Sequence, residues 1–69
     1  MSVYRVTEVI GVSEESWEDA ARDAVKTAAA TVRDLRVAEV IRKDVTIENG
    51  QVKNFRVRLA LSFKYETGD

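Results

Sequence analysis

The sequence lacks cysteine, histidine and proline, and it contains only one tryptophan, two tyrosines and two phenylalanines. The absence of cysteine excludes disulfide bonds and thiolate chemistry, and the absence of both cysteine and histidine excludes the ordinary zinc sites. The same absences remove the usual nucleophile–base pairs of enzymes. Carboxylate pairs remain as acid–base groups, but no spacing in the chain singles one out. We therefore expect a protein that is not an enzyme.

A large excess of charge and a long apolar segment are also missing. Eleven basic residues stand against twelve acidic ones, for a formal net charge of −1. This balance argues against nucleic acid or an anionic membrane surface as a partner. No apolar run approaches the roughly 18 residues of a membrane-spanning helix. The start, Met1-Ser2-Val3-Tyr4-Arg5, lacks the apolar segment of a signal peptide, so we expect a cytoplasmic protein.

The length of 69 residues predicts a single domain, residues 1–69. A domain of this size buries only about 60% of the surface that its unfolded chain exposes, which leaves a lone monomer marginally stable. Disulfides, a structural metal and partner subunits are the usual compensations. Because disulfides and the ordinary zinc sites are excluded, we expect a homo-oligomer.

Four segments carry secondary-structure patterns, in the order strand, helix, strand, strand. Residues 3–10 are rich in β-branched side chains and apolar on both faces, which predicts a strand covered on both sides. After a break at Gly11, Ser13 is the predicted N-cap of a helix. The helix carries an apolar stripe at steps of three and four residues. Its members are Trp17, Ala21, Ala24, Ala28, Val32 and Leu35. Because alanine dominates this stripe, the helix is predicted to pack very close to its neighbour.

The dipeptide Asn49-Gly50 separates residues 36–47 from residues 52–65 and predicts a β-hairpin between two strands. In the first strand, one face is predicted to carry Val37, Ile41, Val45 and Ile47. The second strand alternates regularly between apolar and mainly polar residues. Its 14 residues would span about 46 Å at ~3.3 Å each, whereas a compact domain of this size has a radius of gyration of ~11 Å. We expect the strand to curl around the helix or to reach neighbouring subunits.

Several short motifs follow one another along the chain: Val3-Tyr4, Gly11-Val12-Ser13, Ser16-Trp17-Glu18, Ala38-Glu39-Val40 and Ser62-Phe63-Lys64. In this order they resemble the dodecin family, over essentially the whole chain. The resemblance implies an α+β fold of the order β-α-β-β, in which a three-stranded antiparallel sheet partly wraps around one helix. It also implies a homododecamer, a hollow shell of cubic symmetry, which agrees with the expected homo-oligomer.

The resemblance also places the flavin pocket of the family on four positions of this chain. Val37 stands at the position of a tryptophan that sandwiches isoalloxazine rings, and valine offers no aromatic face for stacking. Arg56 replaces a glutamine that hydrogen-bonds the flavin edge. Asp44 replaces a basic residue near the phosphate and would repel that group, whereas Lys64 keeps the charge of another phosphate-side position. These changes argue against tight binding of FMN or riboflavin.

A second branch of the family lacks that tryptophan and is called calcium dodecin. The chain is more similar to this branch, which implies calcium as a ligand, although no segment resembles an EF-hand loop. Glu14, Glu15 and Glu18 are the candidate metal ligands once symmetry gathers several copies, because hard cations prefer oxygen. Alternatively, these carboxylates only stabilise the positive end of the helix dipole.

Other side chains have a functional and a structural interpretation. Trp17, at the head of the alanine stripe, is predicted to pack rather than to bind a ligand. The polar row with Arg56, Arg58 and Lys64 either binds anions at subunit junctions or forms salt bridges. Glu8 and Glu39 interrupt apolar strand faces, and on the helix side they would need ionic partners, for which Arg5 and Arg36 are the candidates.

The sequence thus predicts a small dodecin-like binding or storage protein, a dodecameric shell with a degraded flavin pocket. It would bind calcium or another small ligand at subunit junctions. One alternative is a flavin-binding dodecin with weakened affinity for riboflavin or FMN. Another is a purely structural oligomer or a module that binds a protein partner.

Overall fold

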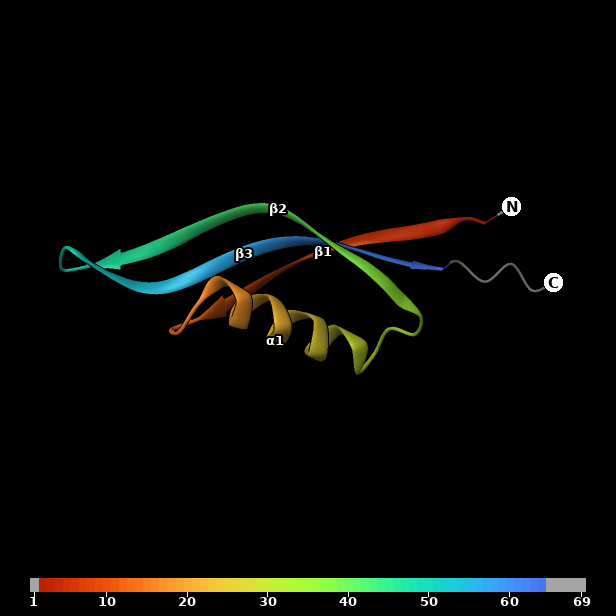
Figure 1. Ribbon diagram of the computed structural model, residues 1–69, viewed down its shortest axis with the longest axis horizontal. Helices are drawn as coiled ribbons and strands as arrows, with labels where there is room; N and C mark the ends of the chain where they lie inside the picture. Colours follow the sequence, from red (N-terminus) through yellow and green to blue (C-terminus); the bar gives the residue numbers. More distant parts are fainter. Residues whose placement is uncertain (1, 65–69) are drawn as a thin grey trace.

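A computed structural model describes residues 2–64 of the chain. The elements are β1 (Tyr4–Ser13), α1 (Trp17–Ala29), β2 (Leu35–Glu48) and β3 (Gln51–Lys64). The three strands form one antiparallel sheet in the order β1-β3-β2, and α1 lies along one face of it (Figure 1). The predicted α+β fold of the order β-α-β-β is therefore confirmed. Within the described residues, no helix has the length and hydropathy needed to span a bilayer.

The core lies between α1 and the central strand β3. Val57, Leu59 and Leu61 of β3 are at most 2% exposed, and Ala20 of α1 is fully buried against them. This confirms the regular alternation predicted for the last strand, up to Lys64. Tyr65, which the same pattern includes, lies outside the described residues. β3 is hydrogen-bonded on both edges and covered by α1. Burial of its apolar row therefore contributes the most to the hydrophobic stabilisation of the fold.

The helix packs on β1 through a backbone contact at Gly11. A Cβ at Gly11 would overlap the carbonyl oxygen of Ala20 and come within 3.0 Å of the Cβ of Ala24. The close approach predicted from the alanine stripe is therefore confirmed. The predicted break at Gly11 is wrong, because β1 continues to Ser13. The glycine permits helix contact within the strand and does not end it.

The start of α1 differs from the predicted one by three residues. Ser16 is the N-cap, and its Oγ accepts a hydrogen bond of 3.0 Å from the backbone N–H of Asp19. Ser13 ends β1 instead. Its Oγ accepts the N–H of Glu15 at 2.9 Å and donates to the Asp19 carboxylate at 2.8 Å. The prediction that Ser13 is the N-cap is wrong, because its hydroxyl makes hydrogen bonds in the turn that precedes the helix.

The end of α1 also comes earlier than the apolar stripe predicts. The helix ends at Ala29, and Asp34 adopts a left-handed backbone with φ of 61°. Leu35 then opens β2 opposite Phe63. The last two members of the predicted stripe, Val32 and Leu35, therefore lie beyond the helix.

Strand β2 is irregular, with register shifts between Leu35 and Val37, Val40 and Arg42, and Thr46 and Ile47. Each irregularity changes which side chains share a face. Val37 is opposite Ser62 on the helix-free face, whereas Val45 is opposite Phe55 on the helix face. The prediction that Val37, Ile41, Val45 and Ile47 share one face is therefore wrong.

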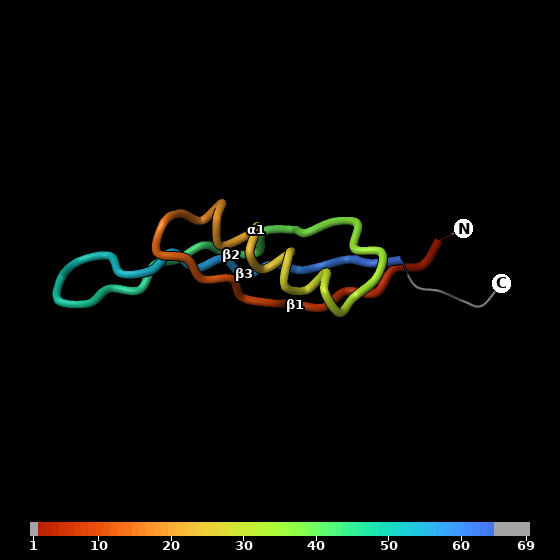
Figure 2. The backbone as a smooth tube through the Cα atoms, turned by 90° about the horizontal axis from the view of Figure 1, so that it is seen from below, coloured from red at the N-terminus to blue at the C-terminus, as the bar shows by residue number. Residues whose placement is uncertain are grey.

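The β2–β3 hairpin projects beyond the N-terminal end of α1 (Figures 1 and 2). Its turn is formed by Asn49 and Gly50, both with positive φ (54° and 75°), as expected for an Asn-Gly hairpin. The molecule measures 55 × 20 × 13 Å, so β3 extends past the helix at the hairpin; that its ends reach neighbouring subunits stays a prediction. Ile47 and Val52 near the tip are 68% and 53% exposed, and the described part of the chain leaves them uncovered.

Candidate functional site

The helix-free face of the sheet carries most of the side chains to which the sequence assigns a function. Cross-strand partners on β1, β3 and β2 form rows across this face. One row joins Val6, Ser62 and Val37, and the next joins Glu8, Ala60 and Glu39. Further toward the hairpin lie Ile10, Arg58 and Arg42, followed by Val12, Arg56 and Asp44. The face is therefore apolar at one end and ionic at the other.

Asp44 and Arg56, two of the four predicted flavin-pocket positions, form a bidentate ion pair. Arg56 donates from Nε at 2.7 Å and from Nη2 at 2.9 Å to the two carboxylate oxygens. The hydrogen bonds from Arg56 hold the pKa of Asp44 below its ordinary value of 3.8, assisted by the charges of Arg56, Arg42 and Arg58. The same hydrogen bonds raise the pKa of Arg56. The Asp44 carboxylate therefore occupies the Nε and Nη2 donors of Arg56, and Arg56 occupies both carboxylate oxygens of Asp44.

Trp17 supports this pair from the helix side. Its Nε1 donates to the backbone carbonyl of Asp44 at 3.0 Å. Its ring makes an edge contact with Phe55, with the ring centroids 5.1 Å apart, and the Lys43 ammonium lies 5.4 Å from the ring centroid. The predicted packing role of Trp17 is confirmed, and the tryptophan anchors the segment of β2 that carries Asp44.

Val37 and Lys64, the other two predicted pocket positions, lie toward the opposite end of the same face. Ser62 of β3 has Val37 as its partner on β2 and Val6 as its partner on β1. Val37 is 58% exposed and Val6 is 62% exposed. Ser62 is six positions along β3 from Arg56, a distance of about 20 Å along the strand. One chain therefore brings Asp44 and Arg56 together but separates them from Val37 and Lys64.

At the ionic end of the face, the structure adds Ile10 and Arg42 to the candidate residues named from the sequence. A cleft at this end is lined by Ile10, Arg42, Asp44, Arg56 and Arg58. The alternation of β3 pointed to Arg56 and Arg58, but no sequence pattern placed Arg42 opposite them, because the irregularity at Val40 and Arg42 breaks the alternation of β2.

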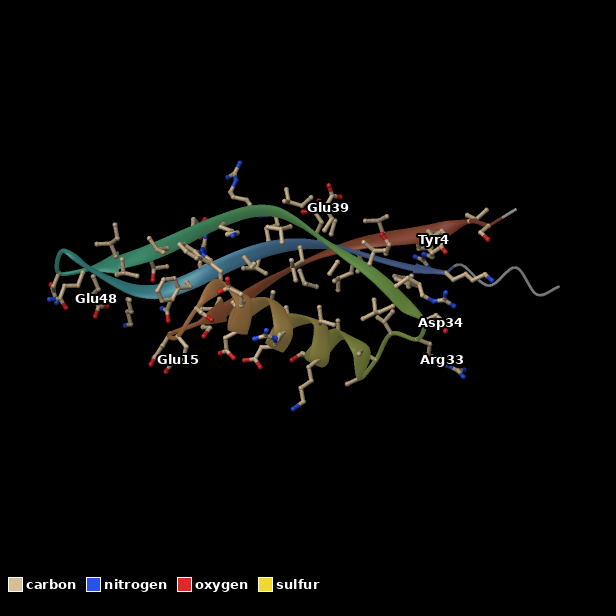
Figure 3. All side chains as sticks on the ribbon, in the orientation of Figure 1. Tyr4, Glu15, Arg33, Asp34, Glu39 and Glu48 are labelled. Carbon is tan, nitrogen blue, oxygen red and sulfur yellow. The ribbon has the colours of Figure 1, made fainter. Side chains whose placement is uncertain are left out.

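Glu8 and Glu39 both lie on the helix-free face (Figure 3 for Glu39). Glu8 accepts a hydrogen bond of 2.9 Å from Nη1 of Arg58, a residue that was not among its candidate partners. Both carboxylates are exposed. They keep their hydration and do not require a buried ionic partner. Arg36 lies 4.0 Å from Asp34 instead.

The candidate metal ligands lie elsewhere in the fold. Glu14 and Glu15 precede α1, and Glu18 is in its first turn, all three exposed to solvent. Figure 3 shows Glu15 on the helix side of the sheet, away from Glu39. Among residues 2–64, no group of three or more carboxylates is close enough to hold a metal ion. A site built from Glu14, Glu15 and Glu18 would therefore require several copies.

Comparison with known proteins identifies the fold and the family together. The dodecin family model matches residues 3–66. The calcium dodecin of Mycobacterium tuberculosis is 45% identical over 64 residues, which is 93% of this chain and 90% of that protein. The chain belongs to the dodecin family.

Solved dodecin structures agree with the architecture. The dodecin from Streptomyces coelicolor superposes with a TM-score of 0.91 at 42% identity, covering 97% of this chain and 96% of the other. A structure of the Mycobacterium tuberculosis calcium dodecin, described as calcium chelating and as having a novel calcium-binding site, superposes with a TM-score of 0.82 at 42% identity, covering 99% and 97%. The resemblance found in the sequence is thereby confirmed, with relatives that include a calcium dodecin.

Proposed function

We propose that this dodecin is a homododecameric binding or storage protein, located in the cytoplasm, that binds calcium or another small ligand at subunit junctions and does not use a flavin sandwich. The observation that carries the proposal is which residues stand at the flavin-pocket positions and how they are paired. Val37 presents a half-exposed aliphatic side chain, and Arg56 is held by Asp44 in a bidentate pair. The similarity to a calcium dodecin at 45% identity supports calcium as the ligand.

The chemistry of the pocket positions disfavours flavin in two ways. A ring sandwich depends on aromatic faces, and the branched side chain of Val37 has none. A flavin edge would also have to compete with the Asp44 carboxylate for the Nε and Nη2 donors of Arg56. Charge-assisted pairs of this geometry are stronger than neutral hydrogen bonds, so the ring edge is the weaker acceptor.

Calcium takes about six to eight oxygen ligands, more than the residues around α1 supply in one chain. In the proposed shell, Glu14, Glu15 and Glu18 of symmetry-related copies provide them. All three side chains are exposed, and the described structure gives none of them a hydrogen bond or ion pair, so each is available to a neighbouring copy.

A native mass spectrum tests the proposal, recorded for the protein as purified, with added calcium and with added FMN. We expect a twelve-subunit mass that retains calcium and no flavin. Glu15→Gln should weaken calcium retention, while the control Glu48→Gln, which removes the same charge at the hairpin, should not. A monomer would contradict the assembly, and an assembled shell that retains neither ligand would identify a purely structural oligomer.

The alternative, a dodecin that binds riboflavin or FMN weakly, has a direct test at Val37. If stacking is the missing contribution, Val37→Trp should strengthen FMN binding by about 1 kcal/mol, roughly fivefold. Quenching of FMN fluorescence measures the change, with Val37→Leu as a control of similar polarity without a ring. Retained flavin in the unmodified protein would contradict the proposal, and no gain in Val37→Trp would mean that the pocket shape is lost as well.

A further inference from the structure

We propose that Asn49 is a site of spontaneous chemical modification, at which the side-chain amide is converted to aspartate or isoaspartate with water as the only co-reactant. The site lies at the tip of the β2–β3 hairpin, and the proposal does not depend on the calcium function. It rests on the exposure of Asn49 and Gly50 and on their contrast with Asn54, the other asparagine of the chain.

The reaction needs the asparagine side chain, the backbone nitrogen of the next residue and water. The backbone N of Gly50 attacks Cγ of Asn49, which forms a new C–N bond. The bond between Cγ and Nδ2 then breaks, and the amide nitrogen leaves as ammonia with the proton that the backbone N has lost. Water opens the resulting succinimide ring at either ring carbonyl, so the products are aspartate and isoaspartate.

The structure leaves the attacking nitrogen accessible. Asn49 and Gly50 form an exposed turn, and a Cβ added at Gly50 would meet no heavy atom within 4 Å. Glycine also has no side chain of its own to obstruct the approach of Cγ. Within residues 2–64, neither the Gly50 N–H nor the Asn49 side chain makes a hydrogen bond that would have to break first.

Asn54 carries the same side chain in a protected setting. It is half-buried, and its own N–H donates to Oγ1 of Thr46 at 3.1 Å. The nitrogen that would attack its side chain belongs to Phe55, which carries a bulky ring. Phe55 lies in the central strand, paired with Ser13 on β1 and Val45 on β2. The attack on Asn54 therefore requires local opening of the sheet, whereas the attack on Asn49 does not.

The two products change the hairpin differently. Aspartate preserves the turn, because Asp-Gly is also a preferred hairpin dipeptide. It adds a negative charge beside Glu48, which pairs with Lys53 at 3.0 Å. Isoaspartate adds a methylene group to the backbone between the partners Glu48 and Gln51, and the tight turn cannot absorb it at the present register. Isoaspartate is therefore the product that opens the hairpin tip.

Peptide mass spectrometry after incubation of the purified protein in mildly alkaline buffer tests the site, with a parallel sample in urea. We expect the folded protein to convert Asn49 faster than Asn54 by about tenfold or more, equivalent to a difference in barrier of about 1.4 kcal/mol. Asn54 is the internal control, since both asparagines are exposed to the same buffer and digestion.

Gly50→Ala places a methyl group beside the attacking nitrogen and should slow the conversion of Asn49. The comparison is made in urea, so that the strain of alanine at the positive φ of Gly50 does not enter. The control Gln51→Ala changes the next residue and should leave the rate unchanged.

Conversion of Asn49 in urea but not in the folded protein would overturn the proposal, because the turn or a neighbouring copy would then protect the site. Equal rates at Asn49 and Asn54 in the folded protein would also overturn it, since conversion would then follow unfolding and not the exposed turn.

Discussion

At Gly11, a single missing side chain controls the distance between β1 and α1. The carbonyl of Ala20 and the Cβ of Ala24 occupy the space that a Cβ would need. We expect Gly11→Ala to lower the free energy of unfolding by about 1–3 kcal/mol, the usual effect of overpacking. Urea unfolding measures the change. The control Val12→Ala alters the next residue, which is 49% exposed, and should lower the free energy of unfolding by less. An equal decrease in both variants would mean that the contact at Gly11 does not constrain the helix.

The ion pair of Asp44 and Arg56 predicts a dependence of stability on pH. The pKa of Asp44 is lower in the folded protein than its ordinary value of 3.8, so the pair stabilises the fold above that value. The contribution is lost as the pH falls through the folded pKa. We therefore expect Asp44→Asn to be less stable than the unmodified protein at neutral pH, with the difference closing in acid.

Thermal unfolding of both proteins across the acid range measures this difference. Glu48→Gln breaks the more exposed pair with Lys53 and should show little change. A constant difference between Asp44→Asn and the unmodified protein at every pH would contradict the role given to the carboxylate charge.

Among the secondary-structure elements, α1 depends on the cap at Ser16. The Ser16 hydroxyl accepts the backbone N–H of Asp19 at 3.0 Å, which satisfies one of the free donors at the helix start. We expect Ser16→Ala to reduce stability by about 1 kcal/mol. Denaturant unfolding is the measurement, with Thr31→Ala as a control because its exposed hydroxyl lies after the helix. A larger loss in Thr31→Ala than in Ser16→Ala would refute the assignment of the cap.

At the scale of the whole molecule, the helix-free face of the sheet is the surface that a single chain leaves uncovered. The helix covers one side of the sheet, and large apolar side chains on the other side are about half exposed: Tyr4, Val6, Ile10, Val12 and Val37. Burial of such surface at ~25 cal/mol per Å² is the main driving force for association. This face is therefore the expected source of the assembly energy.

We expect Val6→Glu to shift the native mass from the assembled form toward the monomer and to lower the unfolding temperature. A charge placed among apolar side chains in a closed interface loses its hydration without a partner. Ala29→Glu introduces the same charge at the exposed end of α1 and should leave the mass unchanged. An unchanged mass for Val6→Glu would exclude this face as an interface.

Local patterns in the sequence were sufficient for the element order, the Asn49-Gly50 turn, the buried row of β3 and the dodecin family. These features depend on neighbouring residues, on strand alternation and on turn chemistry. The same patterns placed the helix cap at Ser13 and ended β1 at Gly11, because they do not include the competing contacts of Asp19 and Ala20.

The candidate sites depended on the tertiary structure. The irregularities of β2 decide that Arg42 is opposite Arg58 and that Val37 flanks Ser62 across from Val6, and a shift of one residue turns a side chain to the other face. The pairing of Glu8 with Arg58 joins residues far apart in the chain. Such contacts are set by the register between strands, a property of the folded sheet that no single segment of the sequence contains.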